Sequence, residues 1–164
     1  MRSSDFERLY EEHAANLYAF LAYRSGDTVL AEDLVADTFE RALRARRRFD
    51  RRRASEKTWL YSIALNLLRD RMRRVNAEER ALERVGAERG FDPGSPLDAI
   101  DERERLSRAL ARLSPPEREA IALRYGADLT LREIARVAGE PRSTIEGRVY
   151  KALDKLRDEL RDAG

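Results

Sequence analysis

Arginine and aromatic residues, rather than nucleophiles, are the side chains of this chain that are best suited to bind a ligand. Residues 46–57 read RRRFDRRRASEK, and residues 58–74, TWLYSIALNLLRDRMRR, add four more arginines. A base can stack on an aromatic ring while guanidinium groups hold phosphates, so aromatic residues between basic clusters favour unstacked nucleic acid. The alternative is that Trp59 and Tyr61 pack in the core or at its rim.

A second group of polar side chains lies in the last third of the chain, where a short turn joins two helical patterns. The patterns read TLREIARVAG and TIEGRVYKALDKLRDEL, with EPRS between them. Gly139 suits the left-handed conformation that closes a helix, and Pro141 prevents that helix from continuing. This is the layout of a DNA-reading helix-turn-helix.

Capping boxes predict both helix starts of this motif. A hydroxyl accepts a hydrogen bond from the backbone N–H three residues later, and the carboxylate at that later position accepts one from the first residue. Thr130 fits this pattern with Glu133, and Ser143 fits it with Glu146. An ordinary helical hairpin with a solvated charged face is the alternative. The polar residues on the flanks or outer face of the second helix are Arg142, Glu146, Arg148, Tyr150 and Lys151.

The composition excludes several classes of chemistry. The 164 residues include no cysteine and one histidine, so disulfides and thiolate chemistry are excluded and structural zinc is all but excluded. His13 has no cysteine or second histidine with which to form a site, which indicates a surface or packing role. We therefore expect no catalytic residue, no metal and no cofactor.

The hydropathy pattern favours a protein that works in the cytoplasm. No apolar run approaches the roughly 20 residues that a membrane span needs, and the N-terminus lacks the charged-then-apolar pattern of a signal peptide. Hydrophobic residues make up 42% and charged residues 39%, which is typical of a soluble helical protein with many surface charges. We expect no membrane insertion.

Two predicted helices precede the first basic cluster and must hold it in place. Ser4 with Glu7 makes another capping-box start, and apolar residues follow at helical spacing until Gly26. Asp27 or Thr28 caps the second helix, whose first half is crowded with carboxylates. Negative charge near a helix N-terminus is favourable in itself, which explains part of this pattern without a partner. The sharper alternative is that the carboxylates form a protein-binding face.

The net charge of +2 conceals a strong segregation of charge along the chain. Residues 1–40 hold nine acidic and three basic side chains, whereas residues 41–57 hold nine basic and two acidic ones. Residues 75–104 reverse the balance again, with nine acidic and four basic side chains. This last segment contains the turn-prone sequence GFDPGSP and is predicted to be a flexible linker.

Helical patterns resume beyond the linker. Apolar residues recur at helical spacing over residues 96–113, and Ser114 with Glu117 predicts a capped helix with proline at its first position. The predicted fold class is therefore all-α, with two small helical domains joined by a flexible linker. The first domain is expected over residues 1–75, the linker over 76–96 and the second domain over 97–164.

Three stretches in the correct order resemble the bacterial sigma factors of the extracytoplasmic-function, or group IV, type in the sigma-70 family. AEDLVADTFERAL is similar to region 2.2, and TWLYSIALNLLRDRMRR is similar to regions 2.3 to 2.4. LSPPEREAIALRYGADLTLREIARVAGEPRSTIEGRVYKALDKL is similar to region 4. The resemblance covers nearly the whole chain. It implies a region 2-like helical bundle, a linker and a region 4-like helix-turn-helix domain in a specificity subunit that is not an enzyme.

The resemblance implies two partners for the first domain. The region 2.2 helix would dock on the beta-prime clamp helices of core RNA polymerase, while the basic loop and the next helix would capture a flipped base of the minus-10 element. Flipping costs about a few kcal/mol, which stacking and backbone contacts offset. The implied polymerase-binding residues are Glu32, Asp33, Asp37, Phe39 and Glu40. The implied minus-10 residues are Arg51, Arg52, Arg53, Ser55, Lys57, Trp59, Asn66, Arg69, Arg73 and Arg74.

For the second domain the resemblance implies contact with the beta flap of the polymerase and with the duplex minus-35 element. The reading helix would begin near Ser143. An anti-sigma partner that covers the contact surfaces is also implied. The implied minus-35 residues are Arg142, Ser143, Thr144, Glu146, Arg148, Tyr150 and Lys151.

The reading helix departs from the family pattern at one place. Where the family commonly has lysine or arginine followed by serine, this chain has Glu146 and Gly147. Glu146 either completes the capping box of Ser143, which we favour, accepts a hydrogen bond from cytosine N4, or marks an altered minus-35 contact. Gly147 costs about 1 kcal/mol inside a helix.

Two alternative functions remain open. One is a stand-alone helix-turn-helix repressor or activator, which would bind a duplex operator without polymerase. The other is a sigma-like adaptor that keeps the polymerase contact but has lost promoter reading, for which the departure at Glu146 and Gly147 is the reason.

Overall fold

The computed structural model describes residues 2–81 and 100–162 and divides the chain into two compact units, Met1–Gly90 and Phe91–Gly164. Both described ranges consist of helices joined by turns and short loops, with no strand in either. The prediction of an all-α fold is therefore confirmed. No helix in these ranges has both the length and the apolar character that crossing a membrane requires.

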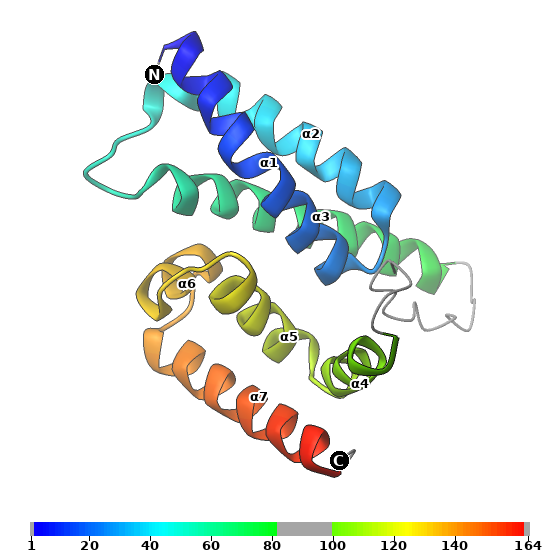
Figure 1. Cartoon of the computed structure of the whole chain (residues 1–164). Coiled ribbons are helices and arrows are strands. Elements are labelled where there is room, and N and C mark those ends of the chain that lie inside the picture. The colour runs from blue at the N-terminus through cyan, green and yellow to red at the C-terminus, as the bar shows by residue number, and fades with distance from the viewer. Residues whose placement is uncertain (1, 82–99, 163–164) are drawn as a thin grey trace. The chain divides into compact units, whose positions relative to one another are not determined.

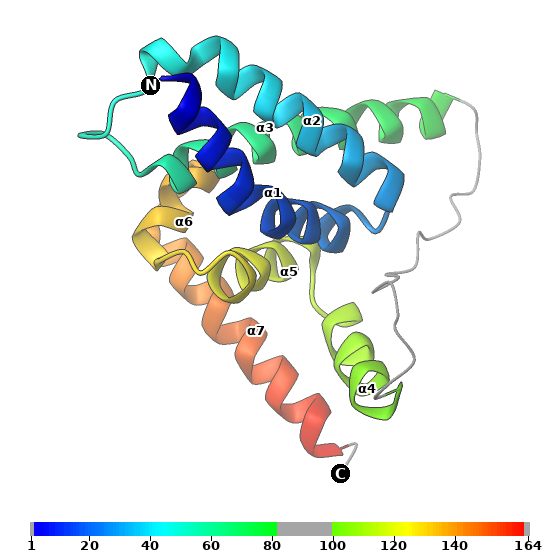
Figure 2. The ribbon, with the colours of Figure 1, turned by 45° about the horizontal axis from the view of Figure 1, so that its top comes forward.

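The first unit is a bundle of three helices (Figures 1 and 2). They are α1 (Ser3–Ser25), α2 (Thr28–Ala45) and α3 (Glu56–Ala81), with the short 3-10 helix η1 (Arg46–Arg48) after α2. Each of the three packs against the other two, because each has an apolar stripe at helical spacing. The largest fully buried side chains of this core are Leu9, Leu17, Leu21, Leu34, Leu60, Tyr61, Leu65 and Leu68.

The break between α1 and α2 follows the sequence prediction. Gly26 closes α1 in the left-handed conformation, with φ of 68°, which glycine adopts without steric cost. The carboxylate of Asp27 accepts a hydrogen bond of 3.1 Å from the backbone N–H of Leu30 and so caps α2. These two residues turn the chain so that α2 runs back along α1.

The predicted start of α1 is wrong. The helix begins at Ser3, one residue before the expected cap at Ser4, and the carboxylate of Asp5 accepts a hydrogen bond of 3.1 Å from the backbone N–H of Arg2. Asp5 stands three residues after Arg2, so it takes the place that the prediction gave to Glu7.

The second unit is built around one long helix (Figure 1). Its elements are α4 (Ile100–Ala111), α5 (Pro115–Ile121), the π-helical turn η2 (Ala122–Gly126), α6 (Leu131–Ala138) and α7 (Arg142–Asp162). The helices α4, α5 and α6 all pack against α7. The buried side chains of the second unit include Leu123, Leu129, Ile134, Val137, Ile145, Val149 and Ala152.

The starts of α5 and α6 are as predicted. Ser114 and Glu117 form a capping box at α5, and Thr130 and Glu133 form one at α6. Gly139 closes α6 with φ of 68°, in the left-handed conformation. The turn of the predicted helix-turn-helix is therefore present.

The predicted cap of α7, Ser143, is two residues too late. The helix begins at Arg142, and the carbonyl of Pro141 accepts backbone hydrogen bonds from Thr144 at 3.1 Å and Ile145 at 3.2 Å. Ser143 consequently lies inside the first turn rather than at the cap. Proline fits this position because it has no N–H to leave unpaired at the helix entry.

The end of α3 also differs from the expected domain boundary. The helix continues through residues 76–81, which were assigned to the linker. The rest of the predicted linker, residues 82–96, lies outside the described part of the chain.

A buried ion pair joins α5 to α7 in the second unit. The side chain of Glu117 is only 6% exposed, and its Oε1 accepts hydrogen bonds of 2.7 Å from Lys155 Nζ on α7 and 2.9 Å from the N–H of Ser114. Burial by itself raises the pKa of Glu117, but the hydrogen bonds from Lys155 and Ser114 outweigh it and lower the pKa from 4.5 to about 2.

This low pKa makes the stability of the second unit depend on pH. Because the folded pKa lies below the unfolded one, Glu117 stabilises the unit fully above about pH 4.5, and the contribution is lost as the pH falls toward 2. We expect Glu117→Gln to lower the free energy of unfolding of the second unit by about 3 kcal/mol at pH 7 and by much less near pH 2. Hydrogen exchange of the α5 and α7 amides at both pH values measures this, with Glu133→Gln as the matched control in the other capping box. Equal losses at the two pH values in the Glu117→Gln variant would contradict the assignment.

Candidate nucleic-acid and protein interfaces

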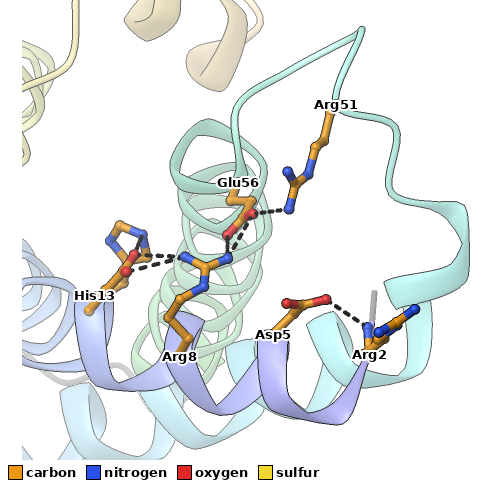
Figure 3. Close-up of polar contacts among 7 residues, drawn as sticks. Arg2, Asp5, Arg8, His13, Arg51 and Glu56 are labelled. Atoms are coloured by element: carbon orange, nitrogen blue, oxygen red, sulfur yellow. Dashed lines mark hydrogen bonds and ion pairs between the residues drawn. The ribbon is translucent and has the colours of Figure 1, made fainter.

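The loop between η1 and α3 is tied to α1 by an ion-pair network around Glu56, the first residue of α3 (Figure 3). The Glu56 side chain is 16% exposed and accepts hydrogen bonds from Arg8 of α1 at 3.1 and 3.2 Å and from Arg51 of the loop at 3.0 Å. Arg8 also donates to Glu12 at 3.2 Å, and these bonds to Glu12 and Glu56 raise the pKa of Arg8. One carboxylate thus holds the loop at the end of the bundle.

His13 lies beside this network on α1 (Figure 3), with its Nε2 3.8 Å from the Glu12 carboxylate. Its side chain is 18% exposed, and burial lowers its pKa below the usual 6.5. The imidazole is therefore neutral near pH 7, packed against its neighbours as the sequence analysis expected.

An aromatic pair stands next to the arginines of the loop. The rings of Phe49 and Trp59 lie 4.7 Å apart at an angle of 36°, and Trp59 remains partly exposed. Tyr61, by contrast, is 1% exposed and packs on Phe20, so the core alternative is correct for Tyr61. Burial raises the pKa of Tyr61 to about 12.

The predicted minus-10 residues of the loop have different environments. Arg51 is paired with Glu56, and the Oγ of Ser55 accepts a hydrogen bond of 3.1 Å from the Thr58 N–H, so Ser55 caps α3. Arg52 and Arg53 are exposed and form no ion pair with any residue of the described ranges. These two guanidinium groups are the ones that the loop leaves available for phosphates.

The predicted residues on α3 continue from the loop along one side of the helix. Trp59, Asn66, Arg69 and Arg73 share a face by helical spacing, and Asn66 and Arg73 are exposed. Arg73 pairs with Asp70 on the same helix, and Arg74 is exposed nearby. Lys57 is half-buried in the first turn. The loop and α3 therefore present aromatic, amide and basic groups in one continuous strip.

The acidic residues of α2 border a groove of about 730 Å³ between α1 and α2. Phe39, predicted as a polymerase contact, is only 5% exposed because Phe6 and Tyr10 of α1 cover it edge-on, at 6.1 and 4.8 Å. It therefore forms the floor of the groove rather than a projecting contact. The groove is lined by Phe6, Tyr10, Ala14, Ala15, Tyr18, Glu32, Val35, Ala36, Phe39, Glu40 and Leu43.

The predicted acidic contacts divide between this groove and other parts of α2. Glu32 and Glu40 line the groove, and Glu40 pairs with Arg44 at 2.5 Å. Asp33 is exposed outside the set that lines it. Asp37 lies 3.7 Å from Arg71 of α3. Sequence reasoning missed Tyr10, which is 50% exposed in the groove, because α1 carried no motif of its own.

In the helix-turn-helix, Arg148 is paired within the protein. Its guanidinium binds the carboxylate of Glu140 in the turn, where the two side chains are 27% and 31% exposed. This ion pair joins the turn to α7 and occupies one of the basic groups predicted for the minus-35 contact. The predicted residues that remain exposed on α7 are Arg142, Ser143, Thr144, Tyr150 and Lys151.

Glu146 does not have the role that the sequence analysis favoured. Because α7 begins at Arg142, Ser143 cannot cap it, and Glu146 makes no hydrogen bond or ion pair with a residue in ranges 2–81 and 100–162. The side chain is half-buried on the flank of the outward face. The capping explanation for this glutamate is therefore wrong.

Comparison with known proteins finds the same two regions in the same order. The sequence profile of Sigma-70 region 2 matches residues 9–78, and that of Sigma-70, region 4 matches residues 109–158. The chain is 33% identical over 162 residues to the "ECF RNA polymerase sigma factor BldN" of Streptomyces coelicolor, and this match covers 96% of the chain and 61% of BldN. It is 32% identical to the "ECF RNA polymerase sigma factor RpoE" of Cereibacter sphaeroides, over 94% of the chain and 86% of RpoE.

Solved structures show the same similarity. The sigma factor RpoE of Bartonella quintana, in a co-crystal structure with the anti-sigma factor NepR, has a TM-score of 0.80 and 29% identity. The match covers 96% of this chain and 97% of that one. CnrH, in complex with the cytosolic domain of CnrY, has a TM-score of 0.71 at 24% identity, a likeness of fold.

The packing of Phe49 on Trp59 can be measured directly, because Trp59 is the only tryptophan of the chain. We expect Phe49→Ala to uncover the indole, so that acrylamide quenches its fluorescence more strongly and its emission shifts to the red. Arg52→Ala, an exposed change in the same loop, should leave both signals unchanged. Equal quenching in the wild type and the Phe49→Ala variant would show that the two rings are not packed in solution.

Proposed function

The chain belongs to the sigma-70 family, in its extracytoplasmic-function group, and from this membership we propose that it is the subunit that directs core RNA polymerase to a promoter and initiates transcription. It acts in the cytoplasm by binding, not as an enzyme. The observation that carries the proposal is the strip formed by the loop and α3, in which the exposed Arg52 and Arg53 lie in the chain between Phe49 and Trp59, whose rings pack together.

That strip is suited to an opened DNA strand. A base extruded from the duplex stacks on the partly exposed Trp59, and the guanidinium groups of Arg52 and Arg53 hold the neighbouring phosphates. Asn66, about two turns further along the same face of α3, offers both a donor and an acceptor to a base edge. Glu56 contributes indirectly, since it fixes Arg51 and with it the position of the loop.

The groove between α1 and α2 is proposed as the docking surface for core RNA polymerase, at its beta-prime clamp helices. Its floor is aromatic, Tyr10 and Leu43 are exposed in it, and Glu32 and Glu40 supply negative charge. The apolar side chains of a partner helix would bury the aromatic floor, and its basic side chains would pair with the two glutamates. Phe39 acts here by supporting the rings of Phe6 and Tyr10.

The second unit is proposed to bind the duplex minus-35 element through α7 and to contact the beta flap. The exposed Arg142 and Lys151 suit phosphates, and Ser143, Thr144 and Tyr150 suit base edges or sugars. Because a solved relative is a complex with an anti-sigma factor, we also propose a protein inhibitor that covers these surfaces.

Run-off transcription with purified bacterial core polymerase tests the function. We expect specific transcripts from promoter fragments only when the chain is present, together with permanganate reactivity of thymines in the minus-10 element. A stand-alone regulator would instead bind duplex DNA without polymerase and produce no transcript, which would refute the proposal.

Charge reversal in the groove tests the polymerase contact separately. Glu32 is exposed and forms no ion pair within the described residues, so Glu32→Arg should leave folding unchanged while it weakens core binding by about tenfold or more. Glu11→Arg, an exposed change on α1 outside the groove, is the matched control. Fluorescence anisotropy of the labelled chain titrated with core polymerase measures both affinities. Equal losses in the two variants would indicate a general charge effect rather than a contact at this groove.

A further inference from the structure

The outward face of α7 has a gap at its centre. Ile145, Val149 and Ala152 form the buried stripe of the helix. With about 3.6 residues per turn, Gly147 is the position within residues 145–152 that lies most nearly opposite that stripe. The helix therefore lacks a side chain in the middle of this part of its outward face.

Nothing in the described part of the protein requires a glycine there. Gly147 is exposed, its φ is not positive, and a Cβ placed on it would meet no atom within 4 Å. Glycine inside a helix is nonetheless unfavourable relative to alanine. The described residues therefore give no reason for this glycine, whereas a partner surface that comes close to the helix backbone would give one.

The neighbouring carboxylate has no partner of its own within the described residues. The side chain of Glu146 makes no hydrogen bond or ion pair with a described residue, although Arg142 lies one turn before it and Tyr150 one turn after it. A free carboxylate on a face that meets DNA repels phosphates, and it is tolerated only where it receives a hydrogen bond from a donor. In the major groove that donor is an exocyclic amino group of a base.

We propose that Glu146 and Gly147 together read one cytosine of the minus-35 element, an inference that rests on the function proposed above. Gly147 lets the helix backbone approach the floor of the major groove, and Glu146 Oε accepts a hydrogen bond from cytosine N4. Cytosine offers only a donor at this edge, whereas guanine and thymine present acceptors that repel a carboxylate, and adenine places its N7 acceptor beside N6. The exposed Arg142, one turn before Glu146, and the exposed Lys151, one turn after Gly147, balance the negative charge against the phosphates.

The choice of glutamate at this position makes a sharp test possible. Glutamine has nearly the same shape but carries both a donor and an acceptor, and it pairs with adenine N6 and N7. Glu146→Gln should therefore move the preference at one base pair from cytosine to adenine. Glu146→Ala should abolish the preference at that base pair and leave the others in place.

The experiment uses the full chain with bacterial core RNA polymerase and a promoter library randomised across the minus-35 element. Sequencing of the bound fraction should show cytosine favoured at one position by about tenfold to a hundredfold in the wild type. Asp158→Asn removes an exposed carboxylate near the end of the same helix and should leave every preference unchanged. Gly147→Leu should weaken selection over the whole element without lowering the melting temperature, because position 147 is exposed and a Cβ there meets no described atom within 4 Å.

The outcomes separate this inference from the function on which it rests. If wild type and Glu146→Gln select the same base at every position, the reading of cytosine is wrong while the function as a sigma factor stands. Unchanged selection by Gly147→Leu would overturn the close approach of the helix backbone. If the wild type enriches no promoter sequence with core polymerase, the function itself fails and this inference fails with it.

Discussion

Each long helix of this protein must bury one stripe of apolar side chains, and that constraint decides which residues can meet a partner. In α7 the stripe of Ile145, Val149 and Ala152 supports α4, α5 and α6 at once, and burial of each large apolar side chain is worth about 1.5–3 kcal/mol. The face opposite that stripe is all that remains for DNA. In α2 the buried Leu34 and Ala42 direct the acidic face toward the groove with α1 in the same way. Recognition surfaces are therefore what the cores leave exposed.

Carboxylates then determine which basic groups on these surfaces are available. Glu56 holds Arg51, and Glu140 holds Arg148, so two arginines that a count of positive charge would assign to DNA are already paired. These ion pairs remain partly open to solvent, and pairs at a protein surface contribute about 0–1 kcal/mol to stability, too little to explain the fold. Their effect is on position: one fixes the loop before α3, and the other joins the turn of the helix-turn-helix to its reading helix. The buried Glu117 is different, because its pairing stabilises the second unit itself.

Short-range features could be predicted from the sequence, whereas features that depend on a distant partner could not. The boxes at Ser114 and Thr130 and the left-handed glycine at 139 involve residues three or four positions apart, so the sequence contains all of their parts. The all-α fold follows from helical spacing for the same reason. The covering of Phe39 by α1 needs a contact between two helices, and no local pattern indicates it. The start of α7 differs from the prediction because two possible caps lie two residues apart, and the helix begins after Pro141 rather than after Ser143.

The open space at Gly147 has a consequence for how such a protein diverges. At most contact positions a substitution that changes recognition also disturbs packing, so new specificity is paid for in stability. At position 147 the described fold imposes no such coupling, since a Cβ there meets no atom within 4 Å and nearly every other residue would improve the helix. Duplicated copies of the gene could therefore explore different target sequences through this residue while remaining folded. If glycine persists at this position in a lineage, the selection that keeps it acts on promoter recognition and not on stability.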